Sequence, residues 1–330
     1  MRARGLQART AGAQWHSCDY RAPPPRSGAC AAPLGTGSAS MLMFGGYAEA
    51  EAGDRSCVAD TWLMAAEDCA LVECDGPTPR ARLCSAAATV GSDVFMFGGW
   101  DSGEEGTGGE ILDDVWVFSG REWRELPARV PGGPTSRHVA CATGDGRVLL
   151  HNHRCSASVL VFDAETGSFH EQPTRGTAPS ARGLHVAFVA GNEMLVALGA
   201  DKFGSFCSDA FALNLDTYTW REVTGGGGGV GPTARAGACA AATGAGDGVV
   251  LGGAQPSRSG GLEACADVAW RLCPERGWSE LELVGGAAPE PRNAAVAAAL
   301  SGGAEDGILF SGGWVPFQRT YADSWVLRLS

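Results

Sequence analysis

Length, composition and charge exclude several classes of protein. The chain has 330 residues, of which 45% are apolar and 19% charged, with 49 glycines and a formal net charge of −12. This composition is typical of an ordered globular chain rather than a disordered one. The acidic balance argues against nucleic acid as a general partner, because phosphate binding needs a basic face. The longest apolar runs, such as residues 148–150, are far too short for a transmembrane helix.

The chain begins with a short basic stretch. Arg2, Arg4 and Arg9 occur before any acidic residue, a pattern that is compatible with an organelle transit peptide. We expect residues 1–12 to form a disordered tail instead, and we expect a cytoplasmic protein. Trp15 follows this tail and, taken alone, belongs to no recognisable motif.

A six-fold repeat fills the rest of the chain. A proline three residues before an arginine recurs six times, and successive arginines are 45 to 57 residues apart. Repetition at this scale indicates an architecture in which one small unit is stacked against its neighbours. We therefore read residues 13–330 as one domain of six units, which start near Arg26, Arg82, Arg137, Arg182, Arg235 and Arg292.

Each unit carries the signals of four short β-strands. An apolar run that ends in two glycines, such as residues 94–99, predicts a buried strand that ends where the backbone turns or packs closely. An aspartate two residues before an aromatic, as in Asp114 and Trp116, marks the third strand. A large aromatic such as Trp123 marks the fourth strand and is expected to fill the space between neighbouring sheets. Units three and four are irregular, because Asn152-His153 and Gly199-Ala200 stand in place of the glycine pair.

This order of motifs resembles the kelch repeat, and the resemblance covers the chain from about Trp15 to its C-terminus. It implies an all-β fold, a single six-bladed β-propeller of four-stranded antiparallel blades around a central channel. The sixth unit stops soon after Trp325, before a fourth strand could form. We expect the N-terminal strand around Trp15 to complete the last blade, because this closure removes two exposed sheet edges.

The connections between second and third strands are long in units one, two and five, and such loops often carry function. The loop of unit two contains Glu104, Glu105 and Glu110. We interpret it as a solvated acidic loop, with a divalent-cation site as the alternative. The glycine run at residues 225–229 is typical of a flexible link between units four and five.

Five of the six histidines fall in units three and four. Strand alternation places His151 and His153 on one face, which allows a bidentate metal site. Only Cys155 is near enough in sequence to add a ligand. We therefore expect no metal, and interpret these histidines as hydrogen-bonded or solvent-facing residues of an eroded repeat.

The twelve cysteines would suit a secreted disulfide framework, but no apolar signal segment precedes the first unit. Cys30, Cys141 and Cys239 each follow a unit's arginine by four residues. We expect them to be small buried residues of the innermost strands.

No catalytic motif stands out in the sequence. A phosphate-binding loop, a G-x-S-x-G elbow and an H-E-x-x-H pair are all missing. Some members of the kelch family are copper oxidases, sugar epimerases or iron-dependent specifier proteins, but none of those sites can be matched residue by residue. We assign no catalytic residue, no cofactor and no metal, and keep a propeller enzyme or a carbohydrate-binding module as alternatives.

The preferred interpretation is a monomeric, non-catalytic protein-interaction module or adaptor with no nucleic-acid or membrane partner. The resemblance implies that the unit arginines, and the residue after each glycine pair, emerge on one face, where kelch adaptors contact acidic peptides. A structural role, capping loop carbonyls, is the alternative for each arginine. We predict a partner segment that is acidic with an apolar anchor, bound off-centre toward units six, one and two. The predicted binding residues are Arg26, Arg82, Arg137, Arg182, Arg235, Arg292, Tyr47, Trp100 and Trp314.

Overall fold

The computed structural model describes residues 12–20, 22–35, 39–49, 55–103, 108–223, 230–301 and 307–329. These ranges contain strands and turns, and none of them holds a helix able to cross a membrane. Three features of the sequence lie outside the described residues: the basic tail up to residue 11, Glu104 with Glu105, and the glycine run at 225–229.

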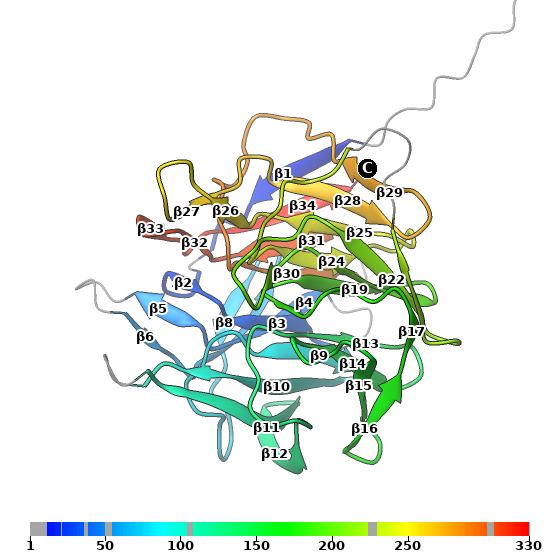
Figure 1. The fold of residues 1–330 in the computed structure, drawn as a ribbon. Helices are drawn as coiled ribbons and strands as arrows, with labels where there is room; N and C mark the ends of the chain where they lie inside the picture. The colour runs from blue at the N-terminus through cyan, green and yellow to red at the C-terminus, as the bar shows by residue number, and fades with distance from the viewer. Residues whose placement is uncertain are drawn as a thin grey trace, which may run out of the picture.

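Six antiparallel sheets of four strands make up the fold (Figure 1). Blade one is β3 (Cys30–Pro33), β4 (Ser40–Phe44), β7 (Thr61–Ala65) and β8 (Cys69–Leu71). Blade two is β9 (Ala86–Val90), β10 (Asp93–Asp101), β11 (Glu110–Ser119) and β12 (Glu122–Arg129). Blade three is β13 (Val139–Ala142), β14 (Arg147–His151), β15 (Ser158–Asp163) and β16 (Ser168–Pro173).

The second half of the chain repeats this order. Blade four is β19 (Val186–Ala190), β20 (Glu193–Ala197), β22 (Ala210–Asn214) and β23 (Thr219–Glu222), with β17 (Arg175–Gly176) added in parallel to β23. Blade five is β24 (Cys239–Ala242), β25 (Gly248–Leu251), β28 (Ala269–Cys273) and β29 (Gly277–Glu280). Blade six is β30 (Val296–Leu300), β31 (Gly307–Ser311), β34 (Ser324–Leu329) and β1 (Ala13–Ser17).

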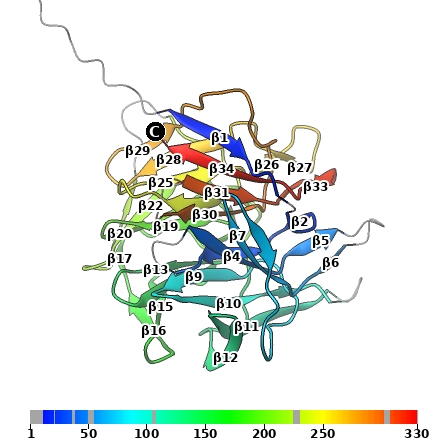
Figure 2. The same cartoon turned by 180° about the vertical axis from the view of Figure 1, so that it is seen from behind.

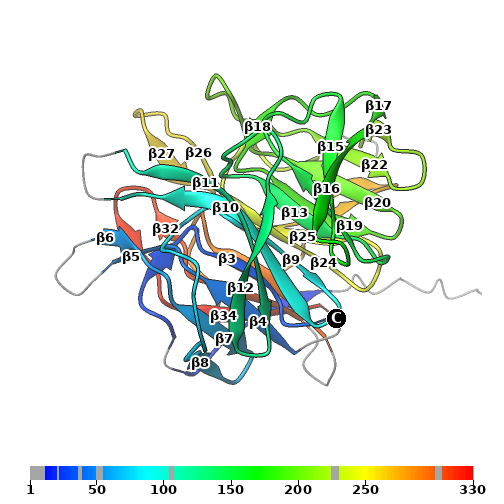
Figure 3. The same ribbon diagram turned by 90° about the horizontal axis from the view of Figure 1, so that it is seen from below.

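The first strand of each blade lines a central channel. In chain order β3, β9, β13, β19, β24 and β30 each contact the next, and β30 returns to contact β3. Figure 3 shows these inner strands gathered at the centre, with the outer strands around them. The all-β fold of four-stranded antiparallel blades is therefore confirmed, and the ring of inner strands is consistent with the six blades that the repeat predicts.

The N-terminal strand closes the ring. Strand β1 pairs with β34 in antiparallel register, with Trp15 opposite Leu327, and the two lie side by side in Figures 1 and 2. Trp15 is buried and its ring packs 5.6 Å from that of Phe310 in β31. The prediction that one blade combines strands from both ends of the chain is therefore confirmed.

The hydrophobic core is divided among the blade interfaces. The six clusters of buried apolar residues each join strands of two neighbouring blades. Between blades one and two, Trp123 of β12 packs 5.2 Å from Phe44 of β4. The middle strands face a neighbour on both sides, which explains why residues 94–97 are all apolar and all buried.

The glycine pairs end the second strands where the next blade approaches. A Cβ on Gly98 would lie 2.5 Å from the carbonyl oxygen of Thr135, and the φ angle of +51° also disfavours a side chain. Beyond the pairs, short hairpins project from one side of the ring (Figure 1): β5 (Tyr47–Glu49) with β6 (Arg55–Cys57), β26 (Ala254–Pro256) with β27 (Leu262–Ala264), and β32 (Trp314–Val315) with β33 (Arg319–Thr320).

The segments that lead into the first strands lie on the same side. They pair with the residues after the glycine pairs through β2 (Arg26–Ser27) on β5, β18 (Arg182–Gly183) on β21 (Ala200–Asp201), and single bridges in blades two, five and six. We call this side the loop face. It is the face on which the sequence places the predicted binding residues.

Candidate functional site

Five of the six predicted arginines lie inside the loop face rather than on it. Arg82 is 1% exposed. Its guanidinium donates to both carboxylate oxygens of Asp114 at 2.6 and 2.8 Å, and to the carbonyls of Gly98 and Arg80 at 2.9 and 3.1 Å. An ion pair with the aspartate that precedes the third strand recurs in Arg26–Asp60, Arg182–Asp209, Arg235–Asp267 and Arg292–Asp323.

The aspartates in these pairs explain the Asp-x-Trp motif. Asp114 also accepts a hydrogen bond from the indole N–H of Trp116 at 2.8 Å. Burial acts to raise the pKa of the Asp114 carboxyl, but the hydrogen bonds and charge of Arg82 outweigh it and lower that pKa below its ordinary value. The ion pair therefore ties the entry of these five blades to their second and third strands.

These contacts agree with the alternative role, in which the buried arginines hold loop carbonyls in place within the blade. The arginines concerned are Arg26, Arg82, Arg182, Arg235 and Arg292. Most donors of each guanidinium are already bonded within its own blade. To bond a guanidinium, a ligand would have to displace an aspartate that is already paired with it, although the aspartates themselves are partly exposed. Their burial and internal hydrogen bonds favour the structural role, and direct contact of these arginines with a partner stays a prediction.

Blade three has a different entry. Thr135 occupies the arginine's position, because its carbonyl accepts the N–H of Gly99 at 2.9 Å just as the carbonyl of Arg82 accepts that of Gly46 at 2.8 Å. Arg137 thus lies two residues further along than the other arginines. Blade three also has Ser158 where the others have the aspartate.

The structure also fixes the positions of the three inner-strand cysteines and of the glycine pair in blade four. Cys30, Cys141 and Cys239 all lie in inner strands, as expected, but Cys141 is the third residue of its strand where the other two are the first. Cys30 and Cys141 are buried and Cys239 is half-buried. In blade four the N–H groups of Leu198 and Gly199 make the contacts that the glycine pair makes elsewhere. The pair there is Leu198-Gly199 and not Gly199-Ala200.

Arg137 belongs to a ring of six equivalent residues that surrounds the channel entrance. Each has a left-handed backbone, with φ between +51° and +69°. Each N–H donates to the carbonyl of its counterpart in the preceding blade at 2.7 to 3.0 Å, so the hydrogen bonds form a closed circle. We call this circle the mouth ring: Gly28, Cys84, Arg137, Leu184, Gly237 and Ala294.

Arg137 is the charged side chain of the mouth ring. It is exposed, and its guanidinium lies 5.3 Å from the ring centroid of Trp100. Among the described residues it has no ion-pair partner. A cation over an indole face is held by the ring quadrupole, yet its N–H groups stay free for a ligand.

Contacts join the loop elements of blades six, one and two. Arg55 of β6 donates to Glu49 at 2.7 Å and to Thr320 of β33 at 3.0 Å, and lies 5.9 Å from the Trp314 ring centroid. On the other side, Ser102 of blade two donates to the Cys57 thiol at 3.1 Å. The three predicted aromatics therefore stand on one connected arc, each of them half-buried.

Phe317, in the turn between β32 and β33, was not predicted. It is 79% exposed and its ring packs edge-on against Trp314 at 5.6 Å. The signal in the sequence was an apolar residue within a short turn after a proline. We call Tyr47, Trp100, Trp314 and Phe317 the aromatic arc.

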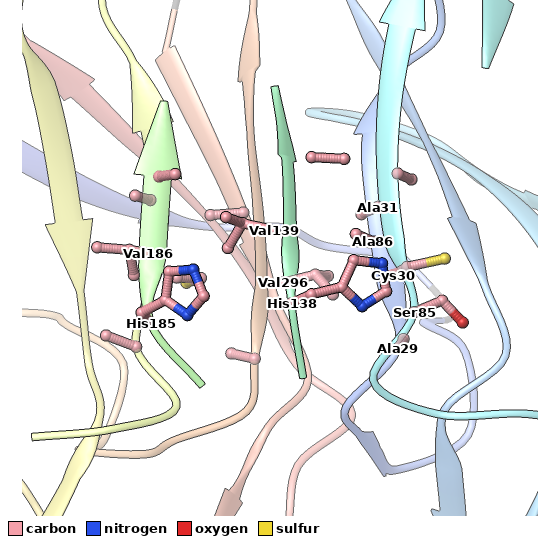
Figure 4. Close-up of a pocket in the computed structure, with 18 residues that line it drawn as sticks. Ala29, Cys30, Ala31, Ser85, Ala86, His138, Val139, His185, Val186 and Val296 are labelled. Atoms are coloured by element: carbon pink, nitrogen blue, oxygen red, sulfur yellow. The ribbon is translucent and has the colours of Figure 1, made fainter. Parts of the chain in front are cut away.

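A second group of polar side chains lies just inside the mouth ring. The next residue in each blade faces the channel, and in blades two, three and four it is Ser85, His138 and His185. They line a cavity of about 200 Å³ (Figure 4). Burial lowers the pKa of His138 to about 3, and lowers that of His185 well below its ordinary value, so both imidazoles are neutral at pH 7.

His151 stands behind His185 and not in the channel. Its Nδ1 lies 3.1 Å from Nε2 of His185, and burial lowers its pKa to about 3. His153 is exposed, because β14 ends at His151 and the chain turns away. The expectation that His151 and His153 share a face is wrong. The described residues hold no cluster of three His, Cys, Asp or Glu side chains placed for a metal.

Six four-stranded blades, packed face to face around a ring of inner strands and closed by the N-terminal strand, define a β-propeller with a loop-bearing face. The sequence matches the KLHDC2/KLHL20/DRC7 Kelch-repeats domain over residues 7–197 and 143–330. The chain belongs to the kelch-repeat family.

Several curated proteins share part of this sequence. It is 28% identical over 159 residues to acyl-CoA-binding domain-containing protein 5 of Arabidopsis thaliana, covering 45% of this chain and 24% of that protein. It is 32% identical over 161 residues to human kelch domain-containing protein 3, covering 43% of this chain and 41% of that protein. The matched stretch thus spans less than half the length of these relatives.

A solved structure shows the same fold. The structure of YjhT superposes with a TM-score of 0.69, covering 94% of this chain and 99% of that one, at 14% sequence identity. At this identity the likeness concerns the fold alone.

Proposed function

We propose that this chain is a protein-interaction module that binds a segment of another protein along the aromatic arc. Membership of the kelch family supports an interaction module in general terms. The observation that carries the particular site is Phe317, which is 79% exposed above Trp314 on a hairpin that Arg55 anchors to blade one. Exposed aromatic side chains on a rigid support are the residues that dominate interface hot spots.

The charges around the arc define the rest of the partner. Arg55 and Arg80 are already paired with Glu49 and Glu110, whereas Arg137 beside Trp100 has no acidic partner among the described residues. We therefore propose a segment with an apolar side chain that packs on Trp314 and Phe317, and an acidic group that reaches Arg137.

The test begins with affinity capture and mass spectrometry to find the partner, followed by comparison of two matched variants. Phe317→Ser removes the exposed ring of the arc, and Phe203→Ser removes a ring of equal exposure, 81%, from blade four. We expect Phe317→Ser to weaken binding at least tenfold, about 1.4 kcal/mol, and Phe203→Ser to change it less than twofold.

Equal effects of the two variants would contradict the site. Turnover of a small molecule, with no protein partner captured, would favour the enzyme alternative instead.

A further inference from the structure

Polar atoms without partners gather in the cavity below the mouth ring. Both ring nitrogens of His138, Nδ1 of His185 and Oγ of Ser85 are buried and make no hydrogen bond within the protein. His138 and His185 are 6% and 5% exposed. Leaving a buried polar group unsatisfied costs about 1–3 kcal/mol, so a cluster of them calls for an explanation. A bound ligand that satisfies them is one.

The cavity has two unlike halves. Ser85, His138 and His185 line it on the side of blades two to four, while the equivalent residues of blades five, six and one are Ala238, Ala295 and Ala29. A smaller cavity of about 140 Å³ at the mouth carries Arg137 on its wall. A ligand therefore meets hydrogen-bonding groups on one side and small apolar groups on the other.

Among the residues that line the two cavities, one side chain is positively charged at pH 7. Arg137 is the cation. The imidazoles are neutral, and burial raises the pKa of the Cys84 thiol to about 11, so it carries no charge at pH 7. The five N–H donors of a guanidinium pair well with a planar carboxylate. A single cation matches a singly charged anion better than a phosphate dianion.

We propose that the channel mouth binds the carboxylate of a small monocarboxylate, or a single carboxylate carried by a larger molecule, through Arg137, Ser85, His138 and His185. The apolar part of the ligand lies against the alanines of blades five, six and one. This site shares Arg137 with the partner site proposed above, but Ser85, His138 and His185 belong to it alone and it uses no residue of the aromatic arc except through the contact of Arg137 with Trp100. Its existence does not depend on that partner.

The test titrates the full chain with acetate and propionate by NMR or calorimetry, with propionamide as the neutral isostere and inorganic phosphate as the dianion. We expect saturable binding of propionate with a Kd on the order of 1 mM, as suits so small a ligand. Propionamide and phosphate should bind at least tenfold more weakly.

Variants locate the site. Arg137→Gln should weaken propionate binding at least tenfold, and Ser85→Ala and His138→Gln several-fold. The exposed residues Arg124 and His170 supply matched controls, and Arg124→Gln and His170→Gln should change the Kd less than twofold. Ser85→Ala keeps the test usable if His138→Gln does not fold.

No saturable carboxylate binding would overturn the proposal, as would binding that Arg137→Gln and Ser85→Ala leave unchanged, or tighter binding of phosphate. A separate arm identifies the source of the carboxylate. If propionate displaces a captured partner, the partner carries the group; if the partner stays bound at saturating propionate, the ligand is free. Phe317→Ser does not alter the cavity, so the failure of one proposal is distinguishable from the failure of the other.

Discussion

Arg82 and Arg137 lie in neighbouring blades but at different positions of the entry segment, because Thr135 takes the place of Arg82 and Arg137 lies two residues further along, in the mouth ring. Arg82 is enclosed because Asp114 neutralises it beside carbonyl acceptors. Arg137 has no such partner among the residues that the structure describes, and its side chain stays at the surface over Trp100. At the scale of the residue, arginine forms a buried structural ion pair at Arg82 and an exposed cation at Arg137.

The first prediction follows from this difference. Arg82→Ala should lower the free energy of unfolding by about 3–5 kcal/mol, because it leaves the Asp114 carboxylate buried without its partner. Arg137→Ala should lower it by no more than about 1 kcal/mol, the size of an exposed cation–π contact. Urea unfolding of both variants against the parent chain measures the contrast. Equal losses would mean that Arg137 is also a structural brace.

The second prediction concerns pH. The pKa values of His138 and His151 are about 3 in the folded chain and near 6.5 once it unfolds. Below pH ~6.5 the unfolded state therefore binds protons that the folded state does not. Their full contribution to stability is present above that pH, and it is lost progressively as the pH falls from ~6.5 toward 3, by at most about 1.4 kcal/mol per pH unit for each histidine.

The free energy of unfolding, measured by urea between pH 7.5 and 5, tests this, because carboxylates stay ionised over that range. His138→Gln should reduce the slope, and the exposed control His170→Gln should not. A stability that stays constant from pH 7.5 to 5 would show that these imidazoles are not buried in solution.

At the scale of the element, β1 shows how one short strand determines whether the fold is complete. It covers the edge of β34 and inserts Trp15 between blades five and six. Without it, blade six would have three strands and one uncovered edge. The strand is only five residues long, yet it joins the two ends of the chain.

The third prediction is that Trp15→Ala lowers the free energy of unfolding by about 3–5 kcal/mol, as is usual when a large buried aromatic is truncated. Gln14→Ala, on the exposed side of the same strand, should change it by less than about 0.5 kcal/mol. Thermal or urea unfolding gives both values. A chain lacking residues 1–20 that unfolds like the parent would contradict closure by β1.

The strands could be predicted wherever each blade must bury its middle strands on both faces and let the next blade approach closely. The middle strands are buried on both faces, so their apolar runs, glycine pairs and Asp-x-Trp motifs stand out in the sequence. The entry of blade three was assigned wrongly, because Arg137 follows a proline as the other arginines do but lies two residues beyond the equivalent position. The missing aspartate before the third strand was the one sign of this shift in the sequence. His138 and Ser85 could not be placed, since nothing local shows which residue of an entry segment faces the channel.

At the scale of the whole molecule, blades are joined by like interfaces, each with its own apolar cluster. The inner strands contribute mainly small residues to the channel. Alanine there leaves room that larger side chains would fill, and the room is polar at the end next to the mouth ring. The scaffold thus separates two surfaces, the aromatic arc at the rim and the cavity on the axis.

The fourth prediction is that the chain works without a bound transition metal. We expect this because Cys155 is the only further ligand close in sequence to His151 and His153, and because the end of β14 separates the two histidines. Elemental analysis of protein purified without an affinity tag should find far less than one copper, iron or zinc per chain. A stoichiometric metal that survives dialysis against a chelator would contradict it.

The mouth ring has an electrical consequence. Every N–H in it donates to the preceding blade, so the six hydrogen-bond dipoles follow one another around a circle. Vectors arranged head to tail in a closed loop sum to nearly zero in its plane, unlike the aligned peptides of a helix, which add. The backbone therefore presents no net pole to a molecule approaching the axis. The side chains therefore determine the electrostatic potential at the channel entrance. Among the described residues of the mouth ring, no carboxylate opposes the charge of Arg137.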